Sequence, residues 1–345
     1  MNQLRIVIAL LLIPTWAFPC TVFSIPQSSR KIVAKSYDWY TGHGLIIVNQ
    51  RGVYKEAFEG SLKWTSRYGS ISLSQLGKEF PQSGMNEKGL VVEILWLDKT
   101  VFPEDDSSLP TINEVQWIQY LLDRADSTKT AIKLANRIQI KKIKADVHYM
   151  VCDRFAKCAT FEYLGGKLTV HSGQDIVVPT LSNHTYEESV NELSKYRGFG
   201  GELPIPRDRD SLGRFVKASD SAKAFRLGQD EIGSAFRILD SVRLWKVTSR
   251  TQWQIVYDVM ERKIYLETRH SKGRKVIQFS AFDFDCRSEA LMYPDIDEES
   301  VGDVSRDFVP YSTELNAKMM HRNTFVPKEI RARGAIYPET LLCNR

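Results

Sequence analysis

The residue with the clearest capacity for chemistry in this chain is Cys20, because of the segment that precedes it. Residues 1–19 begin Met-Asn-Gln-Leu-Arg, continue with a mostly apolar run and end in Ala-Phe-Pro. A basic start and an apolar run of about eleven residues are typical of a secretory signal peptide, and such a run is too short to cross a bilayer. The sequence therefore predicts that residues 1–19 are removed and that the mature chain begins with Cys20.

An N-terminal cysteine carries a nucleophile and a base on one residue. Its α-amine has a reference pKa of about 7.7–8.0, so a useful fraction is unprotonated near neutral pH and could take the thiol proton. Two alternatives stay open. Residues 1–19 could be an N-terminal anchor helix, and Cys20 could be an ordinary residue near a processing site or a disulfide partner. Pro19 is unusual directly before a cut, where signal peptidases favour small residues.

The composition excludes several classes of protein. The 345 residues are 43% hydrophobic and 26% charged, which is typical of neither a disordered nor a fibrous chain. The net charge of +5 is not gathered into a polybasic run, so nucleic acid is not the expected partner. No later apolar stretch is long enough to cross a membrane. We therefore expect an exported protein, periplasmic or secreted, with no integral membrane span after processing.

The histidines and the remaining cysteines give no sign of a metal or a cofactor. The six histidines include no metal-ligand spacing, and the glycine-rich stretch 198–201 lacks the lysine and the helix of a phosphate loop. We expect neither a metal nor a cofactor. Cys152 and Cys158 flank a turn between two predicted strands and could form a disulfide after export, and Cys286 could pair with Cys343.

Hydrophobic periodicity predicts the elements that must position Cys20. The order is strands, two helices, strands, helices and strands, which favours an α+β layered domain over regular βαβ winding. Two antiparallel sheets packed together between helix layers would accommodate it. No break in composition divides residues 20–345, so we expect one domain there. The predicted strands cover parts of 20–97, 147–181 and 253–282. Helices are predicted at 115–122, 131–138, 186–196, 213–225 and 230–242. A long surface loop is predicted at 198–209.

Five short motifs occur in order between residues 20 and 217. They are Cys20-Thr21, Lys35-Ser36-Tyr37-Asp38-Trp39, Gly84-Met85-Asn86-Glu87-Lys88-Gly89-Leu90, Leu181-Ser182-Asn183 and Gly213-Arg214-Phe215-Val216-Lys217. With a cysteine at the processing point, this set resembles the choloylglycine hydrolase family of N-terminal nucleophile hydrolases, which comprises bile salt hydrolases and penicillin V acylases. The resemblance implies a four-layer αββα sandwich, in agreement with the layered prediction, and hydrolysis of a linear amide through a thioester on Cys20.

The resemblance also implies roles for three charged residues. Asp38 matches the family aspartate near the nucleophile and could accept a hydrogen bond from the α-ammonium or thiol of Cys20, with an ordinary turn aspartate as the alternative. Arg214 matches an arginine that would orient Cys20 or lower its thiol pKa. Lys35 stands where the best-known members have arginine. It keeps the charge but loses the bidentate fork, and a surface lysine is the alternative.

Three further residues would meet the substrate. Asn183 matches the family asparagine whose side-chain amide donates to the oxyanion, although Asn183-His184-Thr185 is also a glycosylation sequon. Trp96 stands where bile salt hydrolases have asparagine, and Trp39 follows the aspartate as in some Gram-negative members. Both indoles could line an apolar acyl pocket, and Trp96 could offer its N–H. Core packing is the alternative for both.

These residues together predict an exported amidohydrolase that cleaves the N-acyl bond of a small acylated amine. The two tryptophans favour an aromatic or fatty acyl group, as in penicillin V or an N-acyl homoserine lactone. The alternatives are a bile salt hydrolase, a hydrolase of lipid amides such as ceramides or N-acylethanolamines, and a catalytically inactive exported binding protein. The interval from Asn183 to Arg214 is shorter than in bile salt hydrolases, so the assembly state stays open, with a homo-oligomer as one option.

Overall fold

The computed structural model describes residues 20–104, 108–245, 249–271 and 273–343. The predicted signal peptide, residues 1–19, lies outside the described residues. Within the described ranges, no helix is both long enough and apolar enough to cross a membrane.

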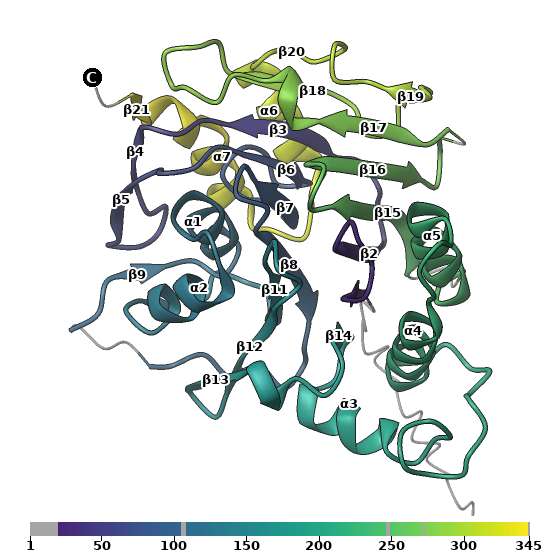
Figure 1. Ribbon diagram of the computed structural model, residues 1–345. Coiled ribbons are helices and arrows are strands. Elements are labelled where there is room, and N and C mark those ends of the chain that lie inside the picture. Colours follow the sequence, from purple (N-terminus) through teal and green to yellow (C-terminus); the bar gives the residue numbers. More distant parts are fainter. Residues whose placement is uncertain (1–19, 105–107, 246–248, 272, 344–345) are drawn as a thin grey trace, which may run out of the picture.

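Most strands of the described residues belong to two large sheets, here named sheet A and sheet B (Figure 1). Neighbouring strands of sheet A run antiparallel, except that β17 and β19 are parallel. In spatial order the strands of sheet A are β14 (Thr180–Leu181), β1 (Thr21–Ile25), β2 (Ile32–Trp39), β15 (Arg250–Asp258), β16 (Lys263–Thr268), β17 (Lys275–Gln278) and β19 (Gly302–Asp303).

Sheet B is antiparallel throughout its described strands. In spatial order they are β13 (Lys167–Ser172), β12 (Cys158–Leu164), β11 (Val147–Cys152), β8 (Val91–Trp96), β7 (Ser83–Asn86), β6 (Ser70–Ser74), β3 (Leu45–Asn49), β18 (Leu291–Tyr293) and β20 (Val309–Pro310). Smaller sheets join β21 (Leu342–Cys343), β4 (Val53–Glu56) and β5 (Lys63–Thr65), and β10 (Gln139–Ile140) with β9 (Thr111–Ile112).

The helices of the described residues lie outside the two sheets, and several begin at side-chain caps. Asp210, for example, accepts a hydrogen bond from the Gly213 N–H, which starts α4. The helices are α1 (Gln116–Arg124), α2 (Thr128–Ala135), α3 (Tyr186–Leu193), α4 (Ser211–Ala224), α5 (Glu231–Ser241), α6 (Thr313–Arg322) and α7 (Lys328–Ile336), with short 3₁₀ turns at Gly173–Asp175, Phe279–Ala281 and Tyr337–Thr340.

Alternation along the strands explains the layers. In β1, Val22 belongs to the core between the two sheets, whereas Phe23 packs in the cluster under α4 and α5. Successive side chains of a strand point to opposite faces, so one short strand serves both cores. On the outer face of sheet B, Val92 of β8 packs with Trp117 of α1. The layers are therefore helices, sheet A, sheet B and helices, which confirms the predicted αββα sandwich (Figure 1).

The C-terminal helices α6 and α7 were not among the predicted elements. Residues 313–322 contain few apolar side chains, and the two buried methionines, Met319 and Met320, are adjacent rather than three or four residues apart. Each methionine packs in a different cluster, so the helix has no single apolar stripe of the kind that periodicity detects. The tertiary environment, rather than the local pattern, determines this element.

Both predicted disulfides are formed. Cys152–Cys158 joins the ends of β11 and β12, and Cys286–Cys343 ties β21 to the segment that follows β17. Cys20 is the free cysteine of the described residues.

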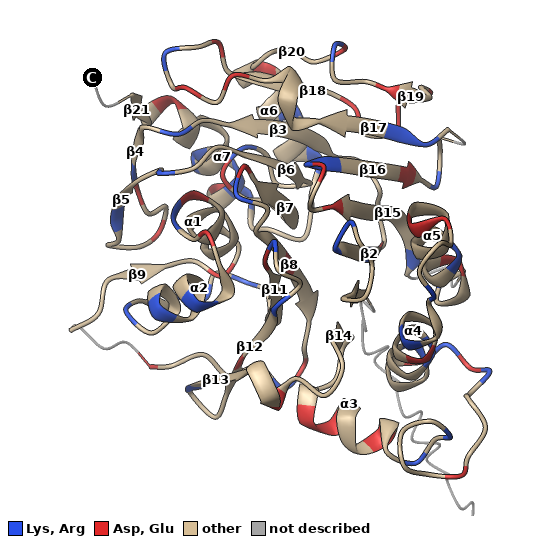
Figure 2. Cartoon of the chain, in the orientation of Figure 1, with Lys and Arg blue, Asp and Glu red and all other residues tan. Residues whose placement is uncertain are grey.

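Charged residues of both signs are interspersed along the described elements (Figure 2). A few charged side chains are buried instead of solvated, among them Lys35, Asp38 and Arg214. These three lie in the part of the sandwich that contains Cys20.

Candidate active site

The strand register of sheet A brings together residues that are far apart in the sequence. Cys20 immediately precedes β1, where Val22 is paired with Leu181 of β14. In an antiparallel pair the chains run in opposite directions, so Asn183, two residues after Leu181, lies level with Cys20, two residues before Val22. On the other side of β1, Thr21 is paired with Ser36 of β2, which brings the segment leading to Asp38 alongside.

The Asp38 side chain points away from the space between the sheets. One of its carboxylate oxygens accepts hydrogen bonds from the hydroxyls of Thr251, at 2.5 Å, and Ser36, at 2.7 Å, and the other accepts from Arg214 at 3.1 Å. The carboxylate is fully buried. Burial raises the pKa of Asp38 above its ordinary value, and Arg214 and the two hydroxyls oppose that rise. Asp38 is thus held in place by several donors and lies in β2, so the alternative of an ordinary turn aspartate is wrong.

Arg214 connects the parts of the cluster. It lies in the first turn of α4 with its side chain fully buried. One terminal nitrogen donates to Asp38 and to the Thr21 hydroxyl, at 3.1 and 3.2 Å, and the other donates to the Asn183 side-chain oxygen at 3.0 Å. Its planar fork therefore joins β1, β2 and the segment after β14 in one arrangement.

The Cys20 thiol lies buried beside this cluster. Its Sγ is 3.9 Å from the main-chain oxygen of Asp38, so the contact differs from the expected one to the carboxylate. Burial raises the pKa of the Cys20 thiol to about 11, because the nearby positive charges of Lys35 and Arg214 offset the loss of solvation only in part. At neutral pH the thiol is therefore protonated, and its use as a nucleophile requires a base.

Lys35 is not a surface residue. It is fully buried, and its ammonium reaches across the sandwich from β2 to sheet B. There it pairs with Glu93 at 2.8 Å and donates to the main-chain oxygens of Gln82, at 2.9 Å, and Ile94, at 2.8 Å, and to the Ser83 hydroxyl at 3.0 Å. These contacts use the donors of the ammonium, so Lys35 acts on Cys20 through its charge while it holds β7 and β8 against β2.

The Asn183 amide is oriented at both ends. Its Nδ2 donates to the main-chain oxygen of Trp96 at 2.7 Å, and its Oδ1 accepts from Arg214. Its own backbone N–H donates to the Ser211 hydroxyl at 2.8 Å, which ties the segment to the start of α4. The structure thus joins Asn183 to the same network as Asp38.

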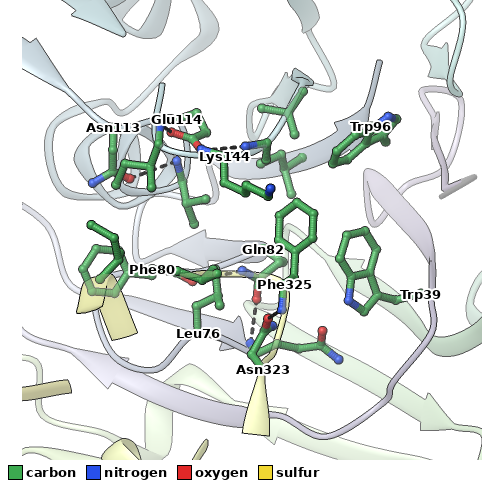
Figure 3. A pocket seen from close by; sticks show the side chains of 18 of the residues that line it. Trp39, Leu76, Phe80, Gln82, Trp96, Asn113, Glu114, Lys144, Asn323 and Phe325 are labelled. Atoms are coloured by element: carbon green, nitrogen blue, oxygen red, sulfur yellow. Dashed lines mark hydrogen bonds between the residues drawn. The ribbon is translucent and has the colours of Figure 1, made fainter. Parts of the chain in front are cut away.

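An apolar cavity opens beside Cys20. It contains about 890 Å³ of space, counting its open mouth. Cys20, Trp39 and Trp96 all line it, as the sequence predicted for the two tryptophans, whose ring centroids are 6.4 Å apart (Figure 3). The Trp96 N–H donates to Asp98 at 2.5 Å, so this group differs from the expectation that it faces a substrate. Its mostly apolar wall with a few polar groups is typical of small-molecule sites.

Comparison with known proteins identifies the family. A family model described as linear amide C–N hydrolases, choloylglycine hydrolase family, matches residues 20–292. The chain belongs to this family. The matched segment starts at Cys20 and contains all the site residues described above, which come from sheet A, β8 and the start of α4.

Individual members of the family are similar over different shares of the chain. A penicillin V acylase from Pectobacterium atrosepticum is 29% identical over 207 residues, which are 54% of this chain and 54% of that protein, so the match spans about half of the relative's length. The structure of penicillin V acylase from Agrobacterium tumefaciens has a TM-score of 0.75 at 25% identity, covering 85% of this chain and 98% of that one.

The fold comparison extends to bile acid hydrolases. A conjugated bile acid hydrolase from Clostridium perfringens has a TM-score of 0.67 at 16% identity, covering 85% of this chain and 96% of that one. At this identity the likeness concerns the fold alone. The choloylglycine hydrolase family of N-terminal nucleophile hydrolases is therefore the structural class to which this sandwich belongs.

Sequence reasoning missed a buried pair behind Asn183. His148 of β11 and Glu162 of β12 are fully buried, with Nδ1 and Oε1 3.0 Å apart, and His148 Nε2 donates to the main-chain oxygen of Ser182 at 2.7 Å. The register that pairs Tyr149 with Phe161 places these two residues opposite each other. The available signal was a histidine and a glutamate in otherwise apolar predicted strands. The pair supports the backbone directly before Asn183.

Within the described ranges of the chain, no group of three or more His, Cys, Asp or Glu side chains is arranged to hold a metal ion.

Proposed function

We propose that the mature chain, exported and beginning at Cys20, hydrolyses the N-acyl bond of a small acylated amine. The observation that carries this proposal is a buried thiol at the end of an apolar cavity, next to the network of Asp38, Arg214 and Asn183. Family membership supports amide hydrolysis as the reaction class. The family match that starts at Cys20 supports this residue as the first of the mature chain.

The proposed reaction has two halves, and the α-amine of Cys20 moves a proton in both. In the first, the amine takes the thiol proton, Sγ attacks the amide carbon, and the protonated amine then gives its proton to the departing nitrogen as the C–N bond breaks. This leaves a thioester on Cys20 and releases the free amine. In the second, the amine takes a proton from water, hydroxide attacks the thioester, and the acid leaves as the thiol is restored.

The surrounding residues have distinct parts in this proposal. Asn183 donates from its side-chain amide to the oxyanion, in the orientation that Arg214 and the Trp96 oxygen impose. Asp38 and Arg214 are positioning residues: Arg214 is held by Asp38 and donates to the Thr21 hydroxyl, next to Cys20, and to the Asn183 side-chain oxygen. The positive charge of Lys35 lowers the pKa of the Cys20 thiol and so offsets part of the rise that burial causes.

The substrate is proposed from the cavity wall. Two indoles next to Cys20 form an apolar surface suited to an acyl group such as phenoxyacetyl or a fatty chain, as in penicillin V or an N-acyl homoserine lactone. The two penicillin V acylases among the relatives support this choice over a bile salt. Much faster turnover of conjugated bile salts than of phenoxyacetyl or fatty-acyl amides by the purified protein would overturn it.

Replacement of Cys20 tests the proposed reaction. In Cys20→Ala, release of free amine from N-acyl substrates should fall to background, while far-UV circular dichroism and the melting temperature stay close to those of the unchanged protein. Cys20→Ser should retain at most a small residual rate. Thiol alkylation should inhibit the parent enzyme and label Cys20. Activity that survives in Cys20→Ala would require another nucleophile and overturn the proposal.

A further inference from the structure

A part of the cavity wall is formed by a segment outside the family match. Residues 313–336 comprise α6, a short link and α7, and they follow the last matched residue, 292. Met320, Asn323, Phe325, Val326 and Ile330 of this segment line the cavity together with residues of the sandwich. The catalytic cluster thus comes from the matched segment, whereas a part of the cavity wall comes from α6, α7 and the link between them.

The link between the helices contributes to the wall near Cys20. The ring of Phe325 lies 5.5 Å from that of Trp39 and 6.0 Å from that of Trp96, both in edge-to-face geometry. Figure 3 shows the three rings on one side of the cavity. Edge-to-face pairs of this kind hold aromatic rings in defined positions. Phe325 therefore narrows the cavity together with Trp39 and Trp96, the two residues that sequence analysis selected.

Met320 lines the cavity and packs with Phe80, which lies on the side away from Trp39 and Trp96 in Figure 3. Its side chain is buried in a cluster with Phe58 and Phe80, whose rings are 5.3 Å apart. This cluster also includes Tyr337. Between the two ends the wall is mostly aliphatic, formed by Leu76, Ile94, Leu95, Val115, Ile143, Val147, Val326 and Ile330.

Three of the polar side chains that line the cavity, Glu114, Gln82 and Asn113, are hydrogen-bonded within the protein itself. Glu114 accepts hydrogen bonds at 2.8 Å from the backbone N–H groups of residues 143, 144 and 145. Gln82 accepts from the Gln75 N–H at 2.6 Å and donates to the Phe80 oxygen at 3.1 Å. Asn113 donates to the Phe58 oxygen at 2.9 Å and accepts from residues 115 and 116. The inner cavity thus offers a ligand an apolar surface.

The C-terminal segment is fastened to the sandwich at several points. Asn316 of α6 accepts from the Lys78 N–H at 2.7 Å and donates to the Ala335 oxygen of α7 at 3.2 Å. The Tyr337 hydroxyl donates to the Glu56 oxygen at 2.6 Å, and the Cys286–Cys343 disulfide holds the strand that follows. The closed end of the cavity therefore has a fixed position relative to Cys20.

We propose that the α6–α7 segment sets the length of the acyl group, and that the substrate class is amides of unbranched aliphatic acids. The acyl chain runs from the carbonyl at Cys20 past Phe325 and ends against Met320. A phenoxyacetyl group would occupy only the part of the cavity near the tryptophans. This inference rests on the proposed amide hydrolysis, because Met320 can limit the length of the acyl group only if the substrate carbonyl lies at Cys20.

A series of amides with one head group and acyl chains from butanoyl to tetradecanoyl tests the inference. Each methylene that enters an apolar site is worth about 0.8 kcal/mol, so kcat/KM should rise about fourfold per added methylene until the chain meets Met320, and then fall. Met320→Ala should move the optimum to a longer chain, and Met320→Trp should move it to a shorter one.

Met319→Ala is the matched control. Met319 is the neighbouring residue of the same helix, equally buried, but it packs with Leu45, Ile47 and Met292 and does not line the cavity. Its replacement should cost similar stability and leave the optimal chain length unchanged. An unchanged optimum in both Met320 variants, or the same shift in Met319→Ala, would overturn the inference.

Binding measurements separate this inference from the proposed function. In the Cys20→Ala background, titration calorimetry with the free acids of the same series should give the same chain-length optimum, displaced by the Met320 substitutions. Absence of amide hydrolysis in the parent protein would overturn the proposed function. Binding without any chain-length optimum would overturn the assignment of Met320 as the end of the acyl site, whatever the activity.

Discussion

The thiol of Cys20 lines the cavity, where it could attack a bound substrate, but its raised pKa keeps it protonated at neutral pH. Burial raises its pKa to about 11, and the positive charges of Lys35 and Arg214 lower it only in part. The Asp38 carboxylate is bound by Thr251, Ser36 and Arg214, and the sulfur lies 3.9 Å from the main-chain oxygen of the same residue. A base close to the sulfur is therefore needed, and the α-amine that processing would expose is the group the sequence supplies.

The pH dependence of the reaction follows from these ionisations. The neutral amine must accept the thiol proton, so kcat/KM should rise with pH through the amine pKa, about 7.7–8.0 in unperturbed form, and fall about tenfold per pH unit well below it. A limb set by loss of the thiolate would instead keep rising toward the raised thiol pKa of about 11, so a plateau above the amine pKa identifies the amine as the base. Initial rates across this range, with circular dichroism at each pH as the control for folding, measure the profile. A flat profile from about pH 5 to 8 would contradict it.

At the scale of elements, a buried ion cluster supports one wall of the cavity. Lys55 of β4 contacts Glu79 at 2.7 Å and Asp123 of α1 at 2.9 Å, and all three side chains are buried. Burial raises the pKa of Asp123 to about 6, although Lys55 opposes this. Glu79 has a φ of +75°, a left-handed conformation uncommon for a residue other than glycine. The cluster thus holds a constrained segment, 75–82, which includes several cavity residues.

Removal of Lys55 should destabilise the protein strongly. Lys55→Ala leaves two carboxylates buried without their cation, and loss of one partner of a buried ion pair costs about 3–5 kcal/mol. Lys63→Ala is the control, because Lys63 of the adjacent β5 pairs with Glu56 in solvent and its loss should leave stability nearly unchanged. Urea denaturation measures both free energies of unfolding. Equal effects of the two substitutions would show that the cluster does not have this structural role.

At the scale of the whole molecule, the proposed chemistry depends on where the mature chain begins. The described fold brings Cys20 to the head of β1 in the centre of the site, between β14 and β2 in the strand order. An amide-bonded Cys20 nitrogen cannot accept a proton as the free amine does. Export and removal of residues 1–19 are therefore proposed as conditions of activity.

Processing can be tested directly. Intact mass and N-terminal sequencing of the exported protein should show Cys20 as the first residue. A variant that retains one extra residue before Cys20 should fold with the same circular dichroism spectrum and lose at least about a hundredfold in kcat/KM, since general base catalysis contributes about that much. Full activity in the extended form, or a mature chain that starts after Cys20, would contradict the proposed mechanism.

The sequence by itself determined the elements whose pattern is local. Continuous apolar runs such as 89–97 predicted buried strands, and spaced apolar residues predicted α1, α2, α4 and α5. The short motifs around Cys20, Asp38, Asn183 and Arg214 identified side chains that the fold then brings into one cluster. These predictions succeeded because period and motif are properties of neighbouring residues.

Only the tertiary structure decided the features that depend on distant pairing. The burial of Lys35 follows from sheet B lying opposite β2, and the direction of the Asp38 carboxylate follows from pairing with Thr251, more than two hundred residues away. The support of Ser182 by His148 depends on β11, and the cavity end at Met320 depends on a helix with no apolar stripe. A sequence records which groups are present, but distances between remote groups are set by sheet register and layer packing, which no local pattern contains.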